Sequence, residues 1–314
     1  MIGKPYDLTG KRVWVAGHNG MVGGAIARRL ATESCDVLTA SRKELDLTRQ
    51  ADVETWMAKA KPDAIFVAAA VVGGILANNT RPVDFLTDNL FIQGNIISTA
   101  HKIGVEKLMF LGSSCIYPRL APQPIPESAL LTGPLEPTNQ WYAIAKISGI
   151  MQCQAYRRQY GRDFISGMPT NLYGPGDNFD LQSSHVLPAL MVKAHNAKVA
   201  GDKTITAWGT GQPRREFLYV DDLADACVFL MKNYSDDEHV NIGTGDDVTI
   251  RELAETISDV VGFEGTFTYD TSKPDGTPKK LMDSAKLNAM GWRAGTDLKQ
   301  GVAKAYDWYR RNAA

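Results

Sequence analysis

Tyr142 and Lys146 lie four residues apart in a stretch of helical character. Residues at this spacing share one face of a helix. A free phenol has a pKa near ~10 and exchanges protons poorly at neutral pH. A neighbouring ammonium group stabilises the phenolate and lowers this pKa, which makes the tyrosine usable as a general acid or base. The spacing therefore indicates a proton-transfer pair, although an ordinary amphipathic helix can carry it too.

A second group of candidates lies in the loop at residues 112–118, which reads GSSCIYP. Cys115 is one of them, because a thiol has a reference pKa near ~8.5 and gains thiolate character beside cations. The adjacent Ser114 is expected to satisfy backbone groups of the loop. The alternative for a lone cysteine is a small buried apolar residue, which is the expectation for Cys35, Cys153 and Cys227.

The elements that must position these groups begin with an apolar run at residues 12–16, typical of a buried parallel strand. Gly17, Gly20 and Gly23 follow, and then a helical pattern. Glycines at this spacing suit a turn that brings backbone N–H groups and a helix N-terminus against a pyrophosphate. The order is G-x-x-G-x-x-G rather than G-x-G-x-x-G. Its place between a strand and a helix predicts a dinucleotide site.

A second strand is expected at residues 36–40 and ends in Ser41, Arg42 and Lys43. An NAD site places an acidic residue near this point to hold the ribose 2′-hydroxyl. Two cations stand there instead, and cations suit a 2′-phosphate. The pattern favours NADP over NAD, while a solvated strand end is the alternative for both side chains.

Further buried strands are predicted at residues 64–70 and 107–111, with a helix over residues 82–103 between them. Strands that alternate with helices in this way predict an α/β fold with a doubly wound, mostly parallel sheet of the Rossmann type. Ligands of such sheets bind beyond the carboxyl ends of the strands. Gly17, Arg42, Ser113 and residues 169–171 all lie at such ends.

After Asn171 the pattern changes to loop, a helix after a serine cap, a strand at residues 204–208 and a turn at residues 209–213. A late strand at residues 239–245 returns to the first sheet. We therefore expect a dinucleotide-binding domain of residues 1–171 plus 216–245. A smaller, discontinuous α/β substrate domain would comprise residues 172–215 plus 246–314.

Composition narrows the function classes. The 314 residues include 34 basic and 35 acidic side chains, so no nucleic-acid or membrane-surface partner is expected. The four cysteines show no Cys-x-x-Cys or His-flanked pattern, which argues against a metal site and for a reducing compartment. No run approaches the ~20 apolar residues that a membrane span needs. These features predict a soluble, cytoplasmic protein without a bound metal.

The glycine turn, the serine after the fourth strand and Tyr-x3-Lys together resemble the extended short-chain dehydrogenase/reductases. Within them, the motifs GSSCIYP, EPTN, YAIAKI, PTNLYGP, REFLYVDD and SKPDGTPKK resemble the GDP-L-fucose synthase family over about residues 11 to 293. The resemblance implies an NADPH-dependent epimerase/reductase. Its substrate would be GDP-4-keto-6-deoxy-D-mannose, with epimerisation at C3 and C5 and hydride reduction at C4.

The same resemblance implies roles for single residues. Ser113 and Tyr142 would bind the C4 carbonyl oxygen, and Tyr142 would protonate it. Lys146 would hold the nicotinamide ribose. Cys115 and His185 would move protons at C3 and C5, since a C4 ketone acidifies the C–H bonds of both neighbouring carbons.

Binding residues follow from the resemblance as well. Those implied for NADP(H) surround the glycine turn and the strand ends: Gly17, His18, Asn19, Gly20, Met21, Val22, Gly23, Arg42, Lys43, Asp46, Leu47, Leu111, Gly112, Lys146, Pro169, Asn171, Leu172 and His185. Those implied for the GDP-sugar lie in the smaller domain: Lys193, Trp208, Arg215 and Asp275. An arginine and a lysine suit a diphosphate, and a tryptophan offers an apolar face.

The sequence departs from the family at Asn19, where many relatives carry arginine, and at Gln140 and Trp141, where Glu-Pro is usual. Two alternative functions stay open. One is a related GDP-deoxyhexose enzyme such as GDP-L-colitose synthase, and the other is a non-catalytic NADP-binding sensor. A homodimer is expected, because the helix within residues 85–103 and the helix of Tyr142 carry surplus apolar residues and pair across a two-fold axis in the resembling enzymes.

Overall fold

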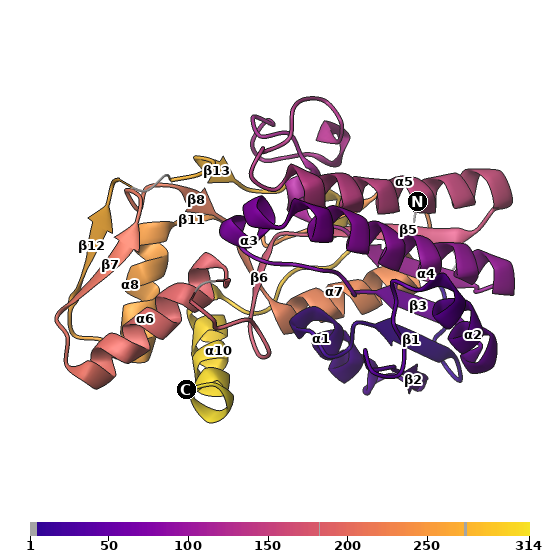
Figure 1. Ribbon diagram of the computed structural model, residues 1–314, viewed down its shortest axis with the longest axis horizontal. Coiled ribbons are helices and arrows are strands. Elements are labelled where there is room, and N and C mark those ends of the chain that lie inside the picture. The colour runs from indigo at the N-terminus through magenta and orange to yellow at the C-terminus, as the bar shows by residue number, and fades with distance from the viewer. Residues whose placement is uncertain (1–4, 182, 273–274) are drawn as a thin grey trace.

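The computed structural model describes residues 5–181, 183–272 and 275–314. It shows a larger α/β lobe and a smaller lobe side by side (Figure 1). The larger lobe is built on a six-stranded sheet in the order β10-β5-β4-β3-β1-β2. All its neighbouring strands pair in parallel, which confirms the doubly wound parallel sheet expected from the sequence. The strands are β1 (Arg12–Ala16), β2 (Asp36–Leu38), β3 (Ala64–Val67), β4 (Lys107–Leu111), β5 (Asp163–Pro169) and β10 (Val240–Ile242).

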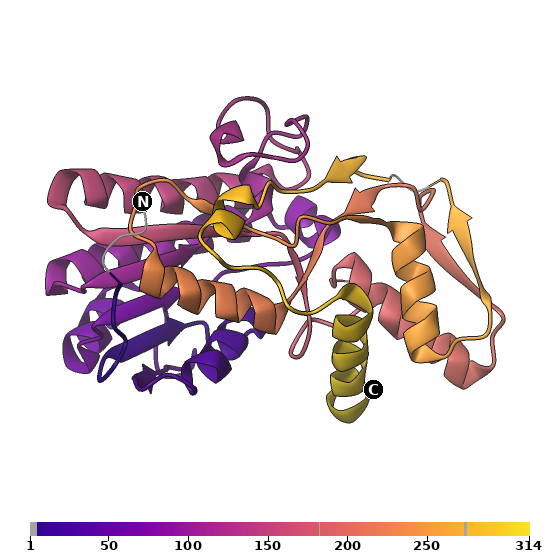
Figure 2. The same cartoon turned by 180° about the vertical axis from the view of Figure 1, so that it is seen from behind.

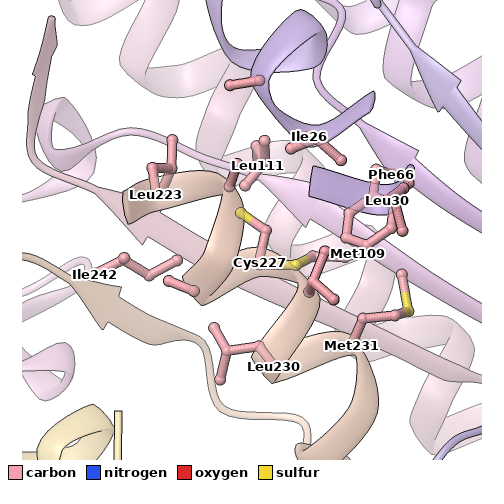
Figure 3. Close-up of a cluster of buried hydrophobic side chains, with 14 of the residues drawn as sticks. Ile26, Leu30, Phe66, Met109, Leu111, Leu223, Cys227, Leu230, Met231 and Ile242 are labelled. Carbon is pink, nitrogen blue, oxygen red and sulfur yellow. The ribbon is translucent and has the colours of Figure 1, made fainter. Parts of the chain in front are cut away.

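Helices cover both faces of this sheet, so its strands must be apolar on both sides. Helices α1 (Met21–Leu30) and α7 (Val220–Asn233) pack together on one face. Figure 3 shows their side chains meeting the strands, with the thiol of Cys227 among apolar neighbours. The other face carries α2 (Gln50–Ala60), α4 (Asn89–Ile103) and α5 (Gln140–Tyr160).

The smaller lobe has its own core, formed by α6 (Val186–Ala200), α8 (Ile250–Val261) and α10 (Leu298–Asn312). Its strands form short sheets. Strands β7 (Thr204–Trp208) and β12 (Thr266–Asp270) pair in parallel, while β8 (Arg214–Arg215) lies between β11 (Val248–Thr249) and β13 (Lys279–Lys280). Strands β6 (Asn171–Tyr173) and β9 (Phe217–Tyr219) pair where the chain crosses between the lobes (Figure 2).

Short helices complete the described chain: α3 (Ile75–Thr80), the π-helix η1 (Asp84–Asp88), the 3₁₀ helices η2 (Ser114–Ile116) and η3 (Glu127–Ala129), and α9 (Ala285–Ala289). The expected strands at 12–16, 107–111 and 204–208 agree with β1, β4 and β7. The expected strand at 36–40 ends at Leu38, and the expected helix at 82–103 is divided between η1 and α4.

One segment packs differently from the expected division into domains. Met282, Leu287 and Trp292 fall within residues 246–314, yet they are buried in the two cores of the larger lobe. Apolar spacing within a short helix does not reveal which lobe covers it. Within the described part of the chain, no helix is long and apolar enough to cross a membrane.

Glu216 holds the junction between the lobes, and its side chain is fully buried. One carboxylate oxygen accepts the backbone N–H of Gly245 (2.8 Å), and the other accepts that of Met282 (3.1 Å). Its backbone carbonyl accepts the side-chain amide of Asn171 (2.7 Å). Burial raises the pKa of this carboxyl group, and the two N–H donors act against the rise. One residue thus joins the chain after β5, after β10 and after β13.

Replacing Glu216 with glutamine tests this junction. Glu216→Gln should lower the free energy of unfolding by about 1–3 kcal/mol. In the wild type each carboxylate oxygen accepts one buried backbone N–H, whereas the glutamine amide would turn its NH₂ group toward one of these N–H groups and leave it without an acceptor. Urea denaturation midpoints and slopes measure the change. Glu264→Gln at an exposed position is the matched control, with an expected change within about 0.5 kcal/mol. Equal midpoints for Glu216→Gln and wild type would contradict the role given to Glu216.

Candidate active site

The predicted site residues of the larger lobe gather at the carboxyl edge of its sheet. The glycine turn follows β1, Arg42 follows β2, Ser113 follows β4 and Asn171 follows β5. All these strands run parallel in one sheet, in which only β3 separates β1 from β4. Their carboxyl ends therefore lie at the same edge of the sheet.

The turn after β1 is packed too tightly for side chains at two of its glycines. Gly17 has φ +92°, and a Cβ there would lie 2.7 Å from the backbone of Ala69. A Cβ on Gly23 would overlap the carbonyl of Gly17. Helix α1 starts at Met21 with no side-chain cap and no acidic residue in its first turn. Its N-terminal N–H groups are therefore suited to an anion.

The segment after β2 presents cations to solvent. Arg42 and Lys43 are exposed, while the carboxylate of Glu44 accepts the N–H (2.8 Å) and hydroxyl (2.7 Å) of Ser41. Asp46 is held by Thr48, whose hydrogen bonds lower its pKa, and Arg42 adds to this effect. The carboxylates of this turn thus have hydrogen-bond partners within the turn, while Arg42 and Lys43 are exposed.

The other residues implied for the cofactor lie around the same edge. His18 has a buried Nδ1 without a hydrogen-bond partner, and its ring lies near enough to Glu44 to lower the pKa of that carboxyl group. The carbonyl of Leu47 accepts the amide of Asn95 (3.0 Å). Asn19 is exposed. The remaining members line the first turn of α1 and the strand ends: Met21, Val22, Gly112, Pro169 and Leu172.

Ser113, Tyr142 and Lys146 meet beyond β4. The hydroxyl of Ser113 lies close enough to the phenol of Tyr142 to lower the pKa of that phenol. Lys146 is buried; its ammonium group donates to the carbonyl of Leu111 (2.8 Å) and lies 5.7 Å from the ring centre of Tyr142. The helix spacing that singled out Tyr142 and Lys146 therefore does place them on one face.

The protonation of this set differs from the sequence expectation. Burial raises the pKa of Tyr142, an effect that Cys115 strengthens and Ser113 opposes. Burial also lowers the pKa of Lys146 to about 8, although Cys115 acts in the opposite direction. Desolvation outweighs the attraction between ammonium and phenolate because both groups lie inside the protein. Tyr142 is consequently a protonated phenol, the form that can donate a proton.

Cys115 lies in the short helix η2, which begins after Ser113. The hydroxyl of Ser113 accepts the backbone N–H of Cys115 (3.4 Å), and the thiol is buried. Burial raises the pKa of this thiol, while Lys280, Ser113 and Lys146 lower it in that order. Burial raises the pKa values of Cys153 and Cys227 as well. These two cysteines lie in apolar cores, whereas Cys115 lies near two lysines.

His185 is the N-cap residue of α6, its side chain makes no capping hydrogen bond, and the residue is exposed. The surrounding protein lowers the pKa of its imidazole, and Lys280 lowers it further. The preceding segment contacts the larger lobe, since the carbonyl of Ser183 accepts the N–H of Gly74 (3.1 Å). Cys115 and His185 therefore share Lys280 as a charged neighbour, although they come from different lobes.

The residues implied for the GDP-sugar lie in the smaller lobe. Asp275 binds the N–H (2.6 Å) and hydroxyl (2.8 Å) of Thr210, which holds the turn that follows Trp208. Burial lowers the pKa of Arg215, and Asp275 opposes this change, so the two lie close together. Trp208 is 65 % exposed at the end of β7. Lys193 donates to the carbonyl of Thr206 (3.0 Å), two residues before Trp208.

Several residues near the site escaped the sequence analysis. Lys280 and Glu136 line a pocket with Cys115, Ser114 and Asn139. Lys280 belongs to the motif SKPDGTPKK, from which only Asp275 was selected. Its neighbour in sequence, Lys279, forms an ion pair with Asp247 instead (3.0 Å). The motif was a signal for Lys280, but only the pairing of β13 with β8 shows where it lies.

A buried polar cluster supports the loop that carries Cys115. The hydroxyl of Tyr117 contacts His239 Nε2 (2.9 Å) and donates to Asn241 Oδ1. Burial lowers the pKa of His239 to about 4, so its ring is neutral. Asn241 also donates to the carbonyl of Ile125 (2.9 Å). Among the described residues, no group of three or more His, Cys, Asp or Glu side chains could hold a metal ion.

A parallel Rossmann-type sheet, a glycine turn before α1 and a serine, tyrosine and lysine beyond β4 define a short-chain dehydrogenase/reductase type of protein. The model of the NAD dependent epimerase/dehydratase family matches residues 13–243. The chain is 60 % identical to GDP-L-fucose synthase of Sinorhizobium fredii over 98 % of both chains. It is 37 % identical to GDP-L-colitose synthase of Yersinia pseudotuberculosis over 95 % of this chain and 97 % of that one.

Among solved structures, a GDP-L-fucose synthetase of Naegleria fowleri bound to NADP superposes with a TM-score of 0.91. It is 30 % identical and covers 99 % of this chain and 98 % of that one. The chain belongs to the NAD dependent epimerase/dehydratase family and, within it, to the GDP-L-fucose synthases.

Proposed function

We propose that this protein is an NADPH-dependent epimerase/reductase that converts GDP-4-keto-6-deoxy-D-mannose to GDP-L-fucose. The observation that carries the proposal is the meeting of Ser113, Tyr142, Lys146 and Cys115 at the sheet edge that also bears the glycine turn. A proton donor and a thiol base thus lie in one site. A non-catalytic NADP-binding sensor would have no use for both.

NADP(H) fits this edge. The tight glycine turn brings the uncapped N-terminus of α1 to the position where a pyrophosphate would bind, and Arg42 and Lys43 are exposed at the strand end where a 2′-phosphate would be bound. Lys146, which lies beside Tyr142, would hold the nicotinamide ribose. When bound, the cofactor supplies the hydride for C4.

Epimerisation would use Cys115 and His185. The C4 carbonyl acidifies the C–H bonds at C3 and C5, so the Cys115 thiolate can take the proton of either carbon and become a thiol. The electron pair moves to the C4 oxygen, where the hydroxyls of Ser113 and Tyr142 can stabilise it. The imidazolium form of His185 would then return a proton to the opposite face of the carbon.

Reduction would use Tyr142 as the acid. Hydride addition at C4 places a negative charge on the oxygen, and Tyr142 donates its phenolic proton to that atom. The raised pKa of Tyr142 keeps this proton in place until hydride arrives. The GDP portion would lie against the smaller lobe, with Arg215 at the diphosphate and Trp208 offering an apolar face.

The direct test is product identification. The protein, incubated with NADPH and GDP-4-keto-6-deoxy-D-mannose, should consume NADPH and yield GDP-L-fucose, identified by NMR. The parallel reaction with the 4-keto sugar that lacks the C3 hydroxyl tests for GDP-L-colitose synthesis. A clear preference for the latter substrate, or no product from either, would refute the proposal.

Mutation should separate the two half-reactions. Cys115→Ser retains the shape but replaces the thiol with a hydroxyl that is much harder to deprotonate. It should slow deuterium incorporation from solvent at C3 and C5. Tyr142→Phe should keep this exchange and reduce NADPH oxidation by a factor of ~10²–10⁴, as is typical when a positioned proton donor is removed. Ser113→Ala should impair both. If Cys115→Ser incorporates deuterium at C3 and C5 at the wild-type rate, Cys115 is not the base and serves only in packing.

The choice of cofactor depends on Arg42. Arg42→Ala should lower kcat/KM for NADPH by about 10- to 100-fold, the loss of a charged hydrogen bond worth roughly 1.5–3 kcal/mol, and leave NADH nearly unchanged. Steady-state kinetics with both cofactors measure the ratio. Arg49→Ala is the control, because Arg49 pairs with Asp52 (3.2 Å) on the surface. An unchanged NADPH preference in Arg42→Ala would exclude Arg42 as the phosphate ligand.

A homodimer through α4 and α5 is part of the proposal. These helices pack together and expose Phe91 (52 %), Ile144 (41 %) and Trp141 (39 %). Phe91→Asp combined with Ile144→Asp should convert a dimer to a monomer in sedimentation at micromolar concentration, since stable dimers bury an apolar core. Val199→Asp, exposed on α6, should leave the dimer intact. A monomeric wild type would contradict the assembly.

We further propose a division into two domains and a cytoplasmic location. A dinucleotide-binding domain of residues 1–171 plus 216–245 and a substrate domain of residues 172–215 plus 246–314 suit a cofactor edge that faces a GDP-binding lobe. The core contacts of Met282, Leu287 and Trp292 would then cross the domain boundary. All four cysteines are free, which favours a reducing compartment such as the cytoplasm.

A further inference from the structure

The pocket beside Cys115 has walls from both lobes. One wall is the loop after β4 and the segment before α5, which contribute Ser114, Cys115, Glu136 and Asn139. Thr277 and the two residues of β13 form the opposite wall. A thiol on one wall therefore faces an ammonium group, Lys280, on the other.

The backbone of Lys280 is fixed on both sides. Strand β13 pairs in parallel with β8, in a register that sets Lys280 beside Arg215. The carbonyl of Lys280 accepts the N–H of Glu216 (3.4 Å), and the N–H of Leu281 donates to the side chain of Gln123 (2.9 Å). These contacts fix the backbone from which the Lys280 side chain reaches the pocket.

The charged and titratable groups around this pair come from several elements. Lys280 and Lys146 act on Cys115 as cations, and Tyr142 and the Ser113 hydroxyl lie beside it. Lys280 in turn faces Arg215 from β8, Glu136 from the segment before α5, and His185 from the start of α6. The groups that surround Cys115 and Lys280 are therefore Ser113, Tyr142, Lys146, Glu136, His185 and Arg215.

We infer that Lys280 is a positioning residue for the epimerisation half of the proposed reaction, where its ammonium group stabilises the thiolate of Cys115. The inference rests on the proposed function, because it explains how a buried thiol can act as a base. Burial alone would keep this thiol protonated, since an isolated charge is poorly solvated inside a protein. A cation across the pocket supplies the compensation that water cannot.

The second cation near Cys115, Lys146, has a hydrogen-bond acceptor of its own. Its ammonium group donates to the carbonyl of Leu111 (2.8 Å). Burial lowers the pKa of both ammonium groups, but Cys115 and Glu136 both oppose this change at Lys280, whereas only Cys115 opposes it at Lys146. Lys280 acts on the thiol more strongly than Lys146 does. It also lowers the pKa of His185, which favours the neutral imidazole in the free protein. The same ammonium group thus opposes the imidazolium form of His185, so Lys280 would assist epimerisation through Cys115 alone.

The test measures the reactivity of Cys115 in the protein without substrate. Iodoacetamide alkylates thiolates, and the tryptic peptide of residues 108–119 contains Cys115 as its one cysteine. Its labelling rate is followed by mass spectrometry from pH 6 to 10. Lys280→Met should raise the midpoint of this profile by about one pH unit, which corresponds to roughly tenfold slower labelling at neutral pH. Lys280→Arg should restore a midpoint near that of the wild type.

Lys279→Met is the matched control, because Lys279 is adjacent in β13 and pairs with Asp247. It should leave the midpoint unchanged. Lys280→Gln provides a second neutral variant if Lys280→Met does not fold, as judged by circular dichroism. At saturating substrate, the neutral variants should also lose deuterium exchange at C3 and C5 in proportion to the lost thiolate, about tenfold at neutral pH.

A folded Lys280→Met or Lys280→Gln protein with the wild-type midpoint would overturn the inference. An equal shift in Lys279→Met would overturn it as well, because the effect would then not belong to Lys280. Neither result would affect the proposed function, which depends on the product of the wild-type reaction. Absence of GDP-L-fucose with an intact midpoint shift would refute the proposed function and leave the electrostatic pairing in place.

Discussion

The buried carboxylate of Glu216 is the constraint on which the arrangement of the site depends. It satisfies backbone N–H groups after β10 and after β13, while the backbone of the same residue binds Asn171 after β5. A buried carboxylate without donors would be costly, and buried N–H groups without acceptors would be costly too. Each side of the junction therefore needs the other. The lobes are fixed at the place where cofactor edge and substrate lobe must meet.

This junction explains how charges from distant parts of the sequence act on one pocket. Glu216 lies between Arg215 and β9, and Met282 follows β13 by two residues. Fixing Glu216 thus fixes Arg215 and Lys280 relative to the loop that carries Cys115. The thiol and the phenol belong to the larger lobe, whereas Lys280 and Arg215 belong to the smaller one. The thiol and the phenol therefore lie on different elements from Lys280 and Arg215, so these two cations can be altered without rebuilding the loop that carries Cys115.

Local patterns in the sequence were sufficient for the sheet and for part of the site. Apolar runs located β1 and β4, glycine spacing located the turn before α1, and the four-residue spacing placed Tyr142 beside Lys146. These features depend on neighbours in the sequence. Lys280 and Glu216 have no such signature, because their surroundings arise from a strand pair about 65 residues apart in the chain and from burial at a lobe junction. The Tyr117–His239–Asn241 cluster was missed for the same reason.

Burial has a common effect on the reacting groups, and this effect divides their roles. It opposes the charged form of Tyr142, Cys115 and Lys146 alike. Tyr142 benefits, because a proton donor must hold its proton until charge develops on the substrate oxygen. Cys115 is hindered, because a base must first lose its proton. A site that needs both behaviours within one pocket cannot obtain them from burial alone. It requires a local cation that acts on the thiol and not on the phenol, and Lys280 is the residue whose charge is directed at Cys115.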